Sequence, residues 1–435
     1  MKTRPEKISV ITLGCAKNTV DSEMLSSQLL TNDFGLVDSV DDADIAIINT
    51  CGFIDAAKKQ SVDTIFETVK RKTEGKLRKV FVMGCLVERY KKELHGEIPE
   101  IDQFFGTHEL PSILKALGGE YKYDLAGERR LSTPQYYGYL KISEGCDNPC
   151  SFCAIPLMRG KHKSKPVEQV MDEVMRLVEK GVKELIVIGQ DTTYYGLDLY
   201  GSRSLGSLLT SLASINELNW IRLMYAYPAK FPLDVLQSYT DNPKICRYID
   251  IPIQHAADNV LRSMRRGITR RAMEDLMQKI RNAVPGIALR TTLIVGYPNE
   301  TEREFEELVQ FIKDVQFDRL GVFTYSQEDE TLAYDLGDPV PALEKERRKE
   351  YLMDIQREIS LHRNESRIGM NTTALIERFE SGLAVGRSEW DAPDIDNEIF
   401  LTPSDADGFH VGDFVPVTIT NASEFDLYGE VIQRS

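Results

Sequence analysis

The stretch EGCDNPCSFCAIP, residues 144–156, contains Cys146, Cys150 and Cys153, which together we call the central trio. A disulfide joins two thiols, and a closed tetrahedral metal site uses four ligands. Three thiols in a CxxxCxxC pattern therefore predict a metal centre with one position left open for something other than protein. Asn148 and Pro149 favour a tight turn that wraps the chain around a compact ligand.

The central trio follows the first of six predicted strands, which alternate with helical segments such as 301–315. Six such repeats predict a partial (βα)6 barrel. Barrel chemistry occurs at the carboxyl ends of the strands, where the central trio lies. The predicted strands cover residues 137–143, 184–191, 220–228, 247–254, 288–296 and 319–326.

Three further cysteines occur in residues 1–130, where strands alternating with helices predict a parallel sheet covered by helices, an αβα domain. Cys15, Cys51 and Cys85, here the N-terminal trio, each follow a predicted strand, in ITLGC, IINTC and VMGC. The carboxyl ends of parallel strands share one edge of a sheet. We therefore expect this trio to meet in space, the alternative being three separate buried cysteines.

The pattern changes again at Asn371, after which short strands are broken by Gly, Pro and Asp with no helical pattern between them. This predicts a small antiparallel β-barrel. The fold class is thus α/β, with an N-terminal parallel αβα domain, a central partial barrel and a C-terminal β-barrel. The predicted domains are residues 1–130, 131–368 (ending in a long charged helix) and 369–435.

Length and composition exclude several classes of protein. The chain has 435 residues and a net charge of −15, which argues against a general affinity for nucleic-acid phosphates. No apolar run reaches the roughly 18 residues of a membrane-spanning helix. Residues 1–10 lack the apolar region of a signal peptide. We expect a cytoplasmic protein without a membrane partner, whose seven cysteines stay reduced.

The central trio has two metal interpretations. Zinc would need a fourth ligand, and His162 would complete the pattern C-x3-C-x2-C-x8-H. Thiolates are the usual protein ligands of iron–sulfur clusters, so a 4Fe–4S cluster fits better. With three cysteines, one of its irons is free to bind a substrate or cofactor.

These motifs together resemble a known family. CxxxCxxC with Phe152 before its last cysteine is similar to the radical S-adenosylmethionine signature. IVGYPNET, residues 294–301, resembles the strand end that contacts adenine in such barrels, with Gly296 as its glycine. A spaced trio, a radical module and a terminal barrel similar to a TRAM domain resemble the radical S-adenosylmethionine methylthiotransferases. The resemblance covers almost the whole chain.

The resemblance implies two 4Fe–4S clusters and S-adenosylmethionine as cofactors. The central trio would hold the cluster that chelates the methionine moiety and cleaves it to a 5′-deoxyadenosyl radical, with Phe152 and Gly296 as further cofactor-binding residues. The N-terminal trio would hold a second cluster that carries the transferred sulfur. An electron donor such as flavodoxin or ferredoxin is also implied, and we expect a monomer.

Three segments resemble the branch that modifies the twelfth protein of the small ribosomal subunit: GQDTTYYG at 189–196, DIPIQHAADNVLRSMRRG at 250–267 and GRSEWDAPDIDNEIFL at 386–401. This implies that an aspartate becomes 3-methylthioaspartate. The radical would take a hydrogen from the β-carbon, the carbon radical would capture sulfur, and a second S-adenosylmethionine would give the methyl group. Lys165 stands where the family often has arginine. Lysine keeps the positive charge but cannot form the bidentate hydrogen bonds of an arginine.

Charge favours the same branch. Residues 370–435 hold thirteen acidic residues against three arginines and no lysine, a net charge of −10. Such a barrel would repel a phosphate backbone and attract a basic ribosomal protein, unless the acids serve only solubility. The competing functions are an adenosine methylthiotransferase of transfer RNA and a two-cluster electron carrier without a substrate.

Other residues have weaker interpretations. His255, at a predicted strand end, either binds substrate or is a structural histidine. Trp390, among acids in a predicted barrel loop, is expected to be an exposed contact for the substrate. Cys246 is expected to be a buried structural thiol. No general acid or base is assigned. A basic cluster beside a predicted helix start either contacts ribosomal RNA or, as we expect, pairs with acidic residues of the protein: Arg265, Arg266, Arg270 and Arg271. Three tyrosines are expected to pack at the domain junction: Tyr136, Tyr137 and Tyr139.

Overall fold

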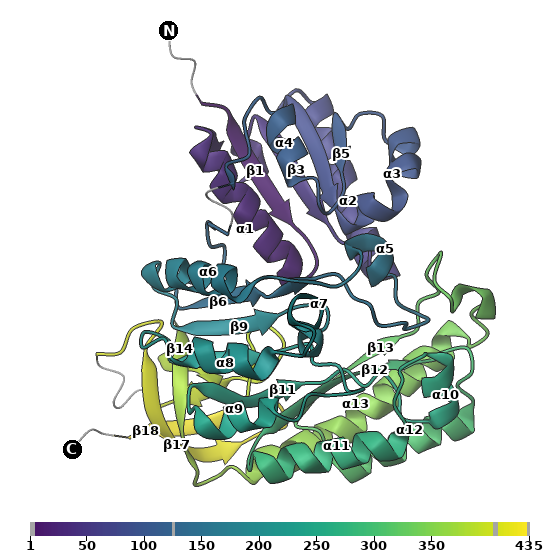
Figure 1. The fold of residues 1–435 in the computed structure, drawn as a ribbon, viewed down its shortest axis with the longest axis vertical. Helices are drawn as coiled ribbons and strands as arrows, with labels where there is room; N and C mark the ends of the chain where they lie inside the picture. Colours follow the sequence, from purple (N-terminus) through teal and green to yellow (C-terminus); the bar gives the residue numbers. More distant parts are fainter. Residues whose placement is uncertain (1–4, 124–126, 403–407, 433–435) are drawn as a thin grey trace.

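A computed structural model describes residues 5–123, 127–402 and 408–432. The chain forms two parallel sheets and a closed barrel, each built from one continuous part of the sequence (Figure 1). The N-terminal sheet stands above the central sheet in this view, and the barrel lies at the lower left. Within the described residues, no helix is long and apolar enough to cross a membrane.

The N-terminal sheet has the strand order β2-β1-β3-β4-β5, and its described pairings are all parallel. Its faces are both apolar: Ile45 and Ile47 of β3 pack into one core, while Ala46 and Ile48 pack into the other. Helices therefore cover both faces, as predicted. The elements are β1 (Lys7–Thr12), α1 (Ala16–Thr31), β2 (Gly35–Leu36), β3 (Ile45–Thr50), α2 (Asp55–Thr73), β4 (Lys79–Gly84), α3 (Cys85–Glu97), β5 (Gln103–Phe105) and α4 (Leu110–Ala116).

The central sheet is open, with the order β13-β12-β11-β10-β9-β6, so the prediction of a partial six-stranded barrel is confirmed. The strands are β6 (Tyr137–Lys141), β9 (Glu184–Ile188), β10 (Trp220–Leu223), β11 (Ile245–Asp250), β12 (Ala288–Val295) and β13 (Arg319–Thr324). The covering helices are α6 (Val167–Glu179), α8 (Leu205–Ala213), α9 (Val235–Asp241), α11 (Arg270–Ala283), α12 (Glu302–Val315) and α13 (Ala342–Glu365). Shorter elements are β7 (Ser143–Glu144), α5 (Ile155–Arg159), β8 (Lys163–Ser164), α7 (Leu197–Tyr200) and α10 (Asp258–Ser263).

The C-terminal barrel closes in the order β14-β15-β16-β18-β17. Its described pairings are antiparallel except that of β16 with β18, which is parallel. Strand β17 pairs antiparallel with β14, and β18 then runs back along β17. The barrel closes where β18 meets β16, and there the two strands run in the same direction. The strands are β14 (Asn371–Glu380), β15 (Leu383–Ser388), β16 (Ile399–Leu401), β17 (Phe414–Ala422) and β18 (Leu427–Val431).

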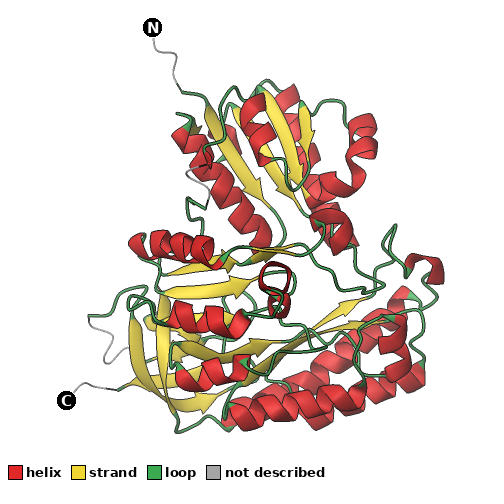
Figure 2. Cartoon of the chain, in the orientation of Figure 1, coloured by secondary structure: helices red, strands yellow, loops and turns green. Residues whose placement is uncertain are grey.

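The barrel packs on the face of the central sheet that the helices leave uncovered (Figure 2). Alternation along β9 shows the division: Leu185 and Val187 face the helices, whereas Ile186 and Ile188 share a core with the barrel. Tyr136 and Tyr137 belong to this shared core, as predicted for the domain junction. The exact boundaries at residues 130 and 368 stay predictions.

Candidate active site between two cysteine trios

The N-terminal trio lies at the carboxyl ends of β1, β3 and β4, and close backbone approach brings its members together. Gly14 has φ +91°, and a β-carbon there would lie 2.7 Å from the β-carbon of Cys51. Gly84 has φ +102°, and a β-carbon there would lie 2.5 Å from Asn49 Oδ1. Only glycine fits both constraints. Cys15 and Cys85, which follow these glycines, are therefore set at the same sheet edge as Cys51.

A buried polar frame lies against Cys51 and Cys85 of the N-terminal trio, whereas Cys15 is exposed. Asn18 is fully buried, and its amide donates to the Leu13 and Thr50 carbonyls. Its Oδ1 accepts from Arg159, which comes from the central domain. Burial raises the pKa of Cys85 to about 12 and also raises that of Cys51, while Arg159 acts in the opposite direction. Buried thiolates need more positive charge than one arginine supplies, and cluster iron would supply it.

The central trio lies in the loop between β7 and α5, and polar donors point at its sulfurs. Cys146 Sγ accepts from the Asn148 side-chain amide at 3.4 Å, and Cys150 Sγ accepts from Arg266 Nη1 at 3.3 Å. Burial raises the pKa of Cys146 to about 11 and that of Cys153 to about 12. Hydrogen bonds to sulfur are a feature of iron–sulfur sites, because they tune the cluster.

Arg266 is a site residue that the sequence analysis did not separate from its basic neighbours. It is 4% exposed, and its guanidinium lies 4.3 Å from the ring centroid of Tyr227. The predicted basic cluster is thus divided, since Arg270 pairs with Glu274 and Asp314 as expected while Arg266 turns toward Cys150. No signal in the sequence distinguishes Arg266, because its contact with the trio is made by the fold.

The N-terminal trio lies beside the segment that follows the central trio. Cys85 shares a small apolar cluster with Ala154 and Met158, which follow the central trio in the chain. Helices α3 and α5 are also in contact. Ion pairs hold this junction: Asp21 of α1 lies 2.6 Å from Arg159, and Lys141 pairs with both Asp21 and Glu144. The N-terminal domain is therefore fixed against the part of the central domain that carries the central trio.

The described side chains give no support to the zinc interpretation. In the described residues, no group of three or more His, Cys, Asp or Glu side chains is spaced to hold one metal ion. Thiolates on a cubane bind different irons, so they lie farther apart than ligands of one ion. His162, the fourth ligand of the zinc interpretation, instead has Nε2 3.0 Å from Ser164 Oγ. The geometry thus disfavours the zinc alternative.

Comparison with known proteins gives the family. The chain is 51% identical over 434 residues to the ribosomal protein uS12 methylthiotransferase RimO of Chloroherpeton thalassium, covering 99% of this chain and 100% of that one. It is 53% identical to the protein of the same name from Flavobacterium psychrophilum, covering 98% of each. The chain belongs to the RimO family of methylthiotransferases. Family models match along the chain: uncharacterized protein family UPF0004 at 7–106, the Radical SAM superfamily at 140–312 and the TRAM domain at 368–432.

Solved structures support the fold of this family member. The radical S-adenosylmethionine methyltransferase TsrM from Kitasatospora setae superposes with a TM-score of 0.57 at 14% identity, covering 94% of this chain and 84% of that one. The cobalamin-dependent enzyme OxsB gives a TM-score of 0.51 at 14% identity, covering 82% and 56%. The predicted architecture, with a radical S-adenosylmethionine fold at its centre, is therefore confirmed.

The residues predicted to bind substrate lie inside the protein. Both ring nitrogens of His255 have protein partners, because Nδ1 accepts from Ala257 N at 3.0 Å and Nε2 lies 3.2 Å from Glu300. This geometry supports the structural interpretation of His255. The expected exposure of Trp390 is wrong: it is 5% exposed, and the Arg367 guanidinium lies 4.6 Å from its ring centroid.

The predicted cofactor contacts Phe152 and Gly296 lie near the carboxyl edge of the central sheet. Gly296 follows β12 with φ +74°, and a β-carbon there would meet Lys345 Cγ at 2.3 Å. Phe152 packs against an apolar cluster that contains Tyr297 and Tyr325. These contacts explain both residue types structurally, and their cofactor roles stay predictions. Cys246 is 1% exposed within the shared core, the place expected for a structural thiol.

Part of the acidic excess of the C-terminal barrel is used in ion pairs with the central domain. Asp391 pairs with Arg319 at 2.6 Å, and Asp396 pairs with Arg290 at 3.2 Å, so both hold the barrel on the central domain. Less negative charge is therefore free for a basic partner than the count implies. The counted residues Asp405, Asp407 and Arg434 lie outside the described residues.

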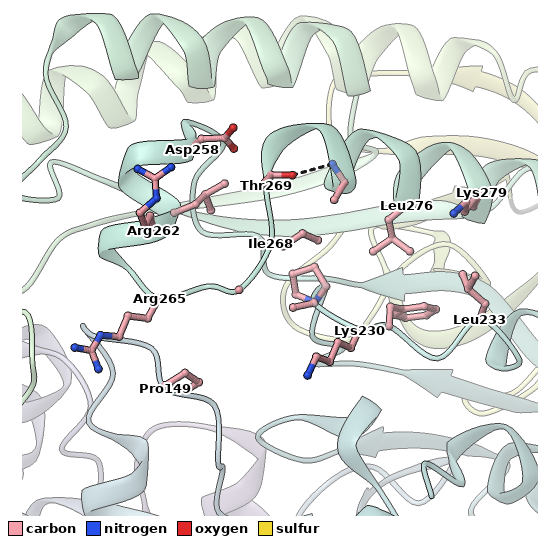
Figure 3. Close-up of a pocket in the computed structure, with 16 residues that line it drawn as sticks. Pro149, Lys230, Leu233, Asp258, Arg262, Arg265, Ile268, Thr269, Leu276 and Lys279 are labelled. Atoms are coloured by element: carbon pink, nitrogen blue, oxygen red, sulfur yellow. Dashed lines mark hydrogen bonds between the residues drawn. The ribbon is translucent and has the colours of Figure 1, made fainter.

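An open cleft of about 770 Å³ adjoins the loop of the central trio at Pro149 (Figure 3). Its floor includes Ile268 and Leu276, and four exposed cationic side chains surround it. Figure 3 shows Arg265 and Lys230 extending on either side of Pro149. The cationic residues are Lys230, Arg262, Arg265 and Lys279.

Proposed function

We propose that the chain is a methylthiotransferase that acts on ribosomal protein uS12 and forms 3-methylthioaspartate. The observation that carries this is the packing of Cys85 beside the segment that follows the central trio, in a chain about half identical to uS12 methylthiotransferases over its full length. Two neighbouring sites suit a reaction that must activate a C–H bond and deliver sulfur to the same carbon. A transfer RNA substrate has no comparable support, since the relatives named above act on uS12.

The central trio would hold one 4Fe–4S cluster and the N-terminal trio a second. When bound, the first supplies the electron that cleaves S-adenosylmethionine, and the second supplies the sulfur. The chain itself contributes position and charge: Arg266 and Asn148 orient Cys150 and Cys146, and Arg159 joins the two sites through Asn18. Hydrogen removal from an unactivated β-carbon needs no base, and we assign none.

The test is an anaerobic assay with one batch of reconstituted enzyme, S-adenosylmethionine and dithionite. Purified uS12 is expected to gain one methylthio group in place of one hydrogen, located at an aspartate by fragment mass spectrometry. Transfer RNA in a parallel reaction is expected to stay unmodified, and the reverse outcome would make the enzyme a transfer RNA methylthiotransferase. Absence of 5′-deoxyadenosine would instead support the electron-carrier alternative.

We also propose that an acidic one-electron donor, such as flavodoxin or ferredoxin, docks at the cationic cleft. The cleft adjoins Pro149, next to Cys150, so a donor seated there is close to the central trio. Four cations and one acid, Asp258, line the cleft around an apolar floor, a positive balance that complements an acidic surface in a chain whose net charge is −15.

Charge reversal at this cleft gives a direct prediction. The double variant Lys230→Glu, Arg265→Glu is expected to be reduced by flavodoxin about tenfold more slowly, because steering charges control association rates. Reduction by dithionite should keep its wild-type rate. Lys76→Glu, an exposed position after α2 in the N-terminal domain, is the matched control and should change neither rate. Stopped-flow absorbance measures both, and equal slowing with both reductants would contradict the docking site.

A further inference from the structure

Lys17 extends from the N-terminal domain to the central sheet. It lies in the first turn of α1, two residues after Cys15, and is 7% exposed. Its Nζ lies 2.9 Å from the ring centroid of Tyr225, which follows β10 at the carboxyl edge of the central sheet. The ammonium group is thus placed at the junction of the N-terminal and central domains.

Lys17 has no carboxylate partner of its own, and the negative group that acts on it most strongly is the Cys15 sulfur, two residues before it. Among the residues that the structure describes, its Nζ makes no hydrogen bond and no ion pair, only the contact with Tyr225. The two carboxylates that act on it electrostatically are Asp250 and Glu144. Asp250 is bonded to Arg290 and to Tyr225 N. Glu144 is bonded to Lys141, Arg159 and Gln190.

A second buried lysine at the same junction, Lys141, does have carboxylate partners. The Lys141 side chain is 8% exposed and pairs with both Asp21 and Glu144. An ammonium group has three N–H donors, and a ring face does not replace a hydrogen-bonding carboxylate. Burying a charge without such a partner is unfavourable. Lys17 therefore has unused binding capacity for a carboxylate from another molecule.

We propose that Lys17 Nζ binds the side-chain carboxylate of the target aspartate of uS12 and holds it between the two cysteine trios. This rests on the proposed function. In aspartate the carboxyl carbon is bonded to the β-carbon, so fixing the carboxylate also fixes the carbon that reacts. A negative carboxylate pairs with the ammonium group, whereas a neutral adenine base does not, so Lys17 contributes to the choice of a protein substrate.

The decisive experiment is a double-mutant cycle on binding, read by fluorescence anisotropy with labelled uS12. The holoenzyme is prepared anaerobically as wild type and as Lys17→Met. The two ligands are uS12 and uS12 with the modified aspartate, identified in the activity assay, changed to asparagine. Wild type is expected to bind the aspartate form about tenfold or more tightly than the asparagine form, because charged hydrogen bonds are strong. In Lys17→Met that ratio should fall to near one.

Lys244→Met is the control, since it removes a half-buried lysine whose Nζ donates to the Ile215 and Asn216 carbonyls just before β11, at the opposite edge of the central sheet from the trios, and it should keep the wild-type ratio. Both forms of uS12 are measured with the same preparation of each variant, so partial loss of folded protein does not change the ratio of the two affinities. An unchanged ratio in Lys17→Met would overturn the inference. If the ratio is unchanged and S-adenosylmethionine affinity falls instead, Lys17 binds the methionine carboxylate. Failure of the proposed function is separate, because wild type would then add no methylthio group to uS12.

Discussion

Replacement of the central trio by alanine, Cys146→Ala with Cys150→Ala and Cys153→Ala, is expected to remove about half of the iron and all formation of 5′-deoxyadenosine. Two 4Fe–4S clusters contain about eight irons, so each trio accounts for about four. The thiolates are the bonds that hold the cluster, and Arg266 and Asn148 alone offer no ligand to iron. Iron and sulfide analysis after anaerobic purification measures the first effect, and chromatography of the reaction measures the second.

The N-terminal trio gives the complementary result. Alanine at Cys15, Cys51 and Cys85 is also expected to remove about half of the iron and to abolish methylthio transfer to uS12, while 5′-deoxyadenosine still forms. Cys246→Ala is the control, because that thiol is buried in the core shared with the barrel, and its iron content should equal that of wild type. Complete loss of iron from either trio variant would contradict two independent sites.

The second large effect concerns Glu184, which joins the central sheet to the barrel. Its carboxylate is fully buried and pairs with Arg222 at 2.8 Å and with Arg387 at 2.7 Å. Burial by itself raises the pKa of Glu184, but the two guanidinium groups outweigh burial and hold it below its usual value. Glu184→Gln keeps the shape and leaves two buried cations short of negative charge. We expect a loss of about 3–5 kcal/mol in the free energy of unfolding.

Thermal and urea unfolding of the apoprotein measure this loss. Glu307→Gln is the control, since Glu307 forms an exposed pair with Arg303 on α12 and should cost less than about 1 kcal/mol. A combined change of Glu184→Leu, Arg222→Met and Arg387→Met is expected to recover part of the stability, because no buried charge is then left alone. A Glu184→Gln protein as stable as the control would show that water reaches this network.

Helix α1 shows why some local structure escaped the sequence pattern. The sequence pattern predicts a helix only near residues 22–30, whereas α1 begins at Ala16, directly after Cys15. Its first turns bury polar side chains, among them Lys17, Asn18 and Glu23, against the trio and the central domain. Apolar periodicity is therefore absent where the helix starts, and the pattern becomes readable only farther along.

Trp390 shows that the exposure of a side chain cannot be predicted from its neighbours in the sequence alone. Its neighbours in sequence are acids, which favours an exposed loop, yet Asp391 and Asp396 are neutralised by Arg319 and Arg290 from the central domain. The number of charged residues in a sequence does not show which oppositely charged residues the fold places beside them. Arg266 and Arg159 are likewise defined as site residues only by their contacts.

The sequence by itself determined the three architectures and the convergence of each cysteine trio. Alternating apolar strands specify their sheets, and a residue placed directly after a parallel strand reaches the common carboxyl edge whatever else the chain does. Only the tertiary structure decided that the N-terminal trio lies beside the segment that follows the central trio, that Arg266 turns to Cys150, and that Lys17 reaches Tyr225 without a carboxylate. These depend on how separately formed sheets dock, and docking is fixed by buried pairs between residues far apart in the chain.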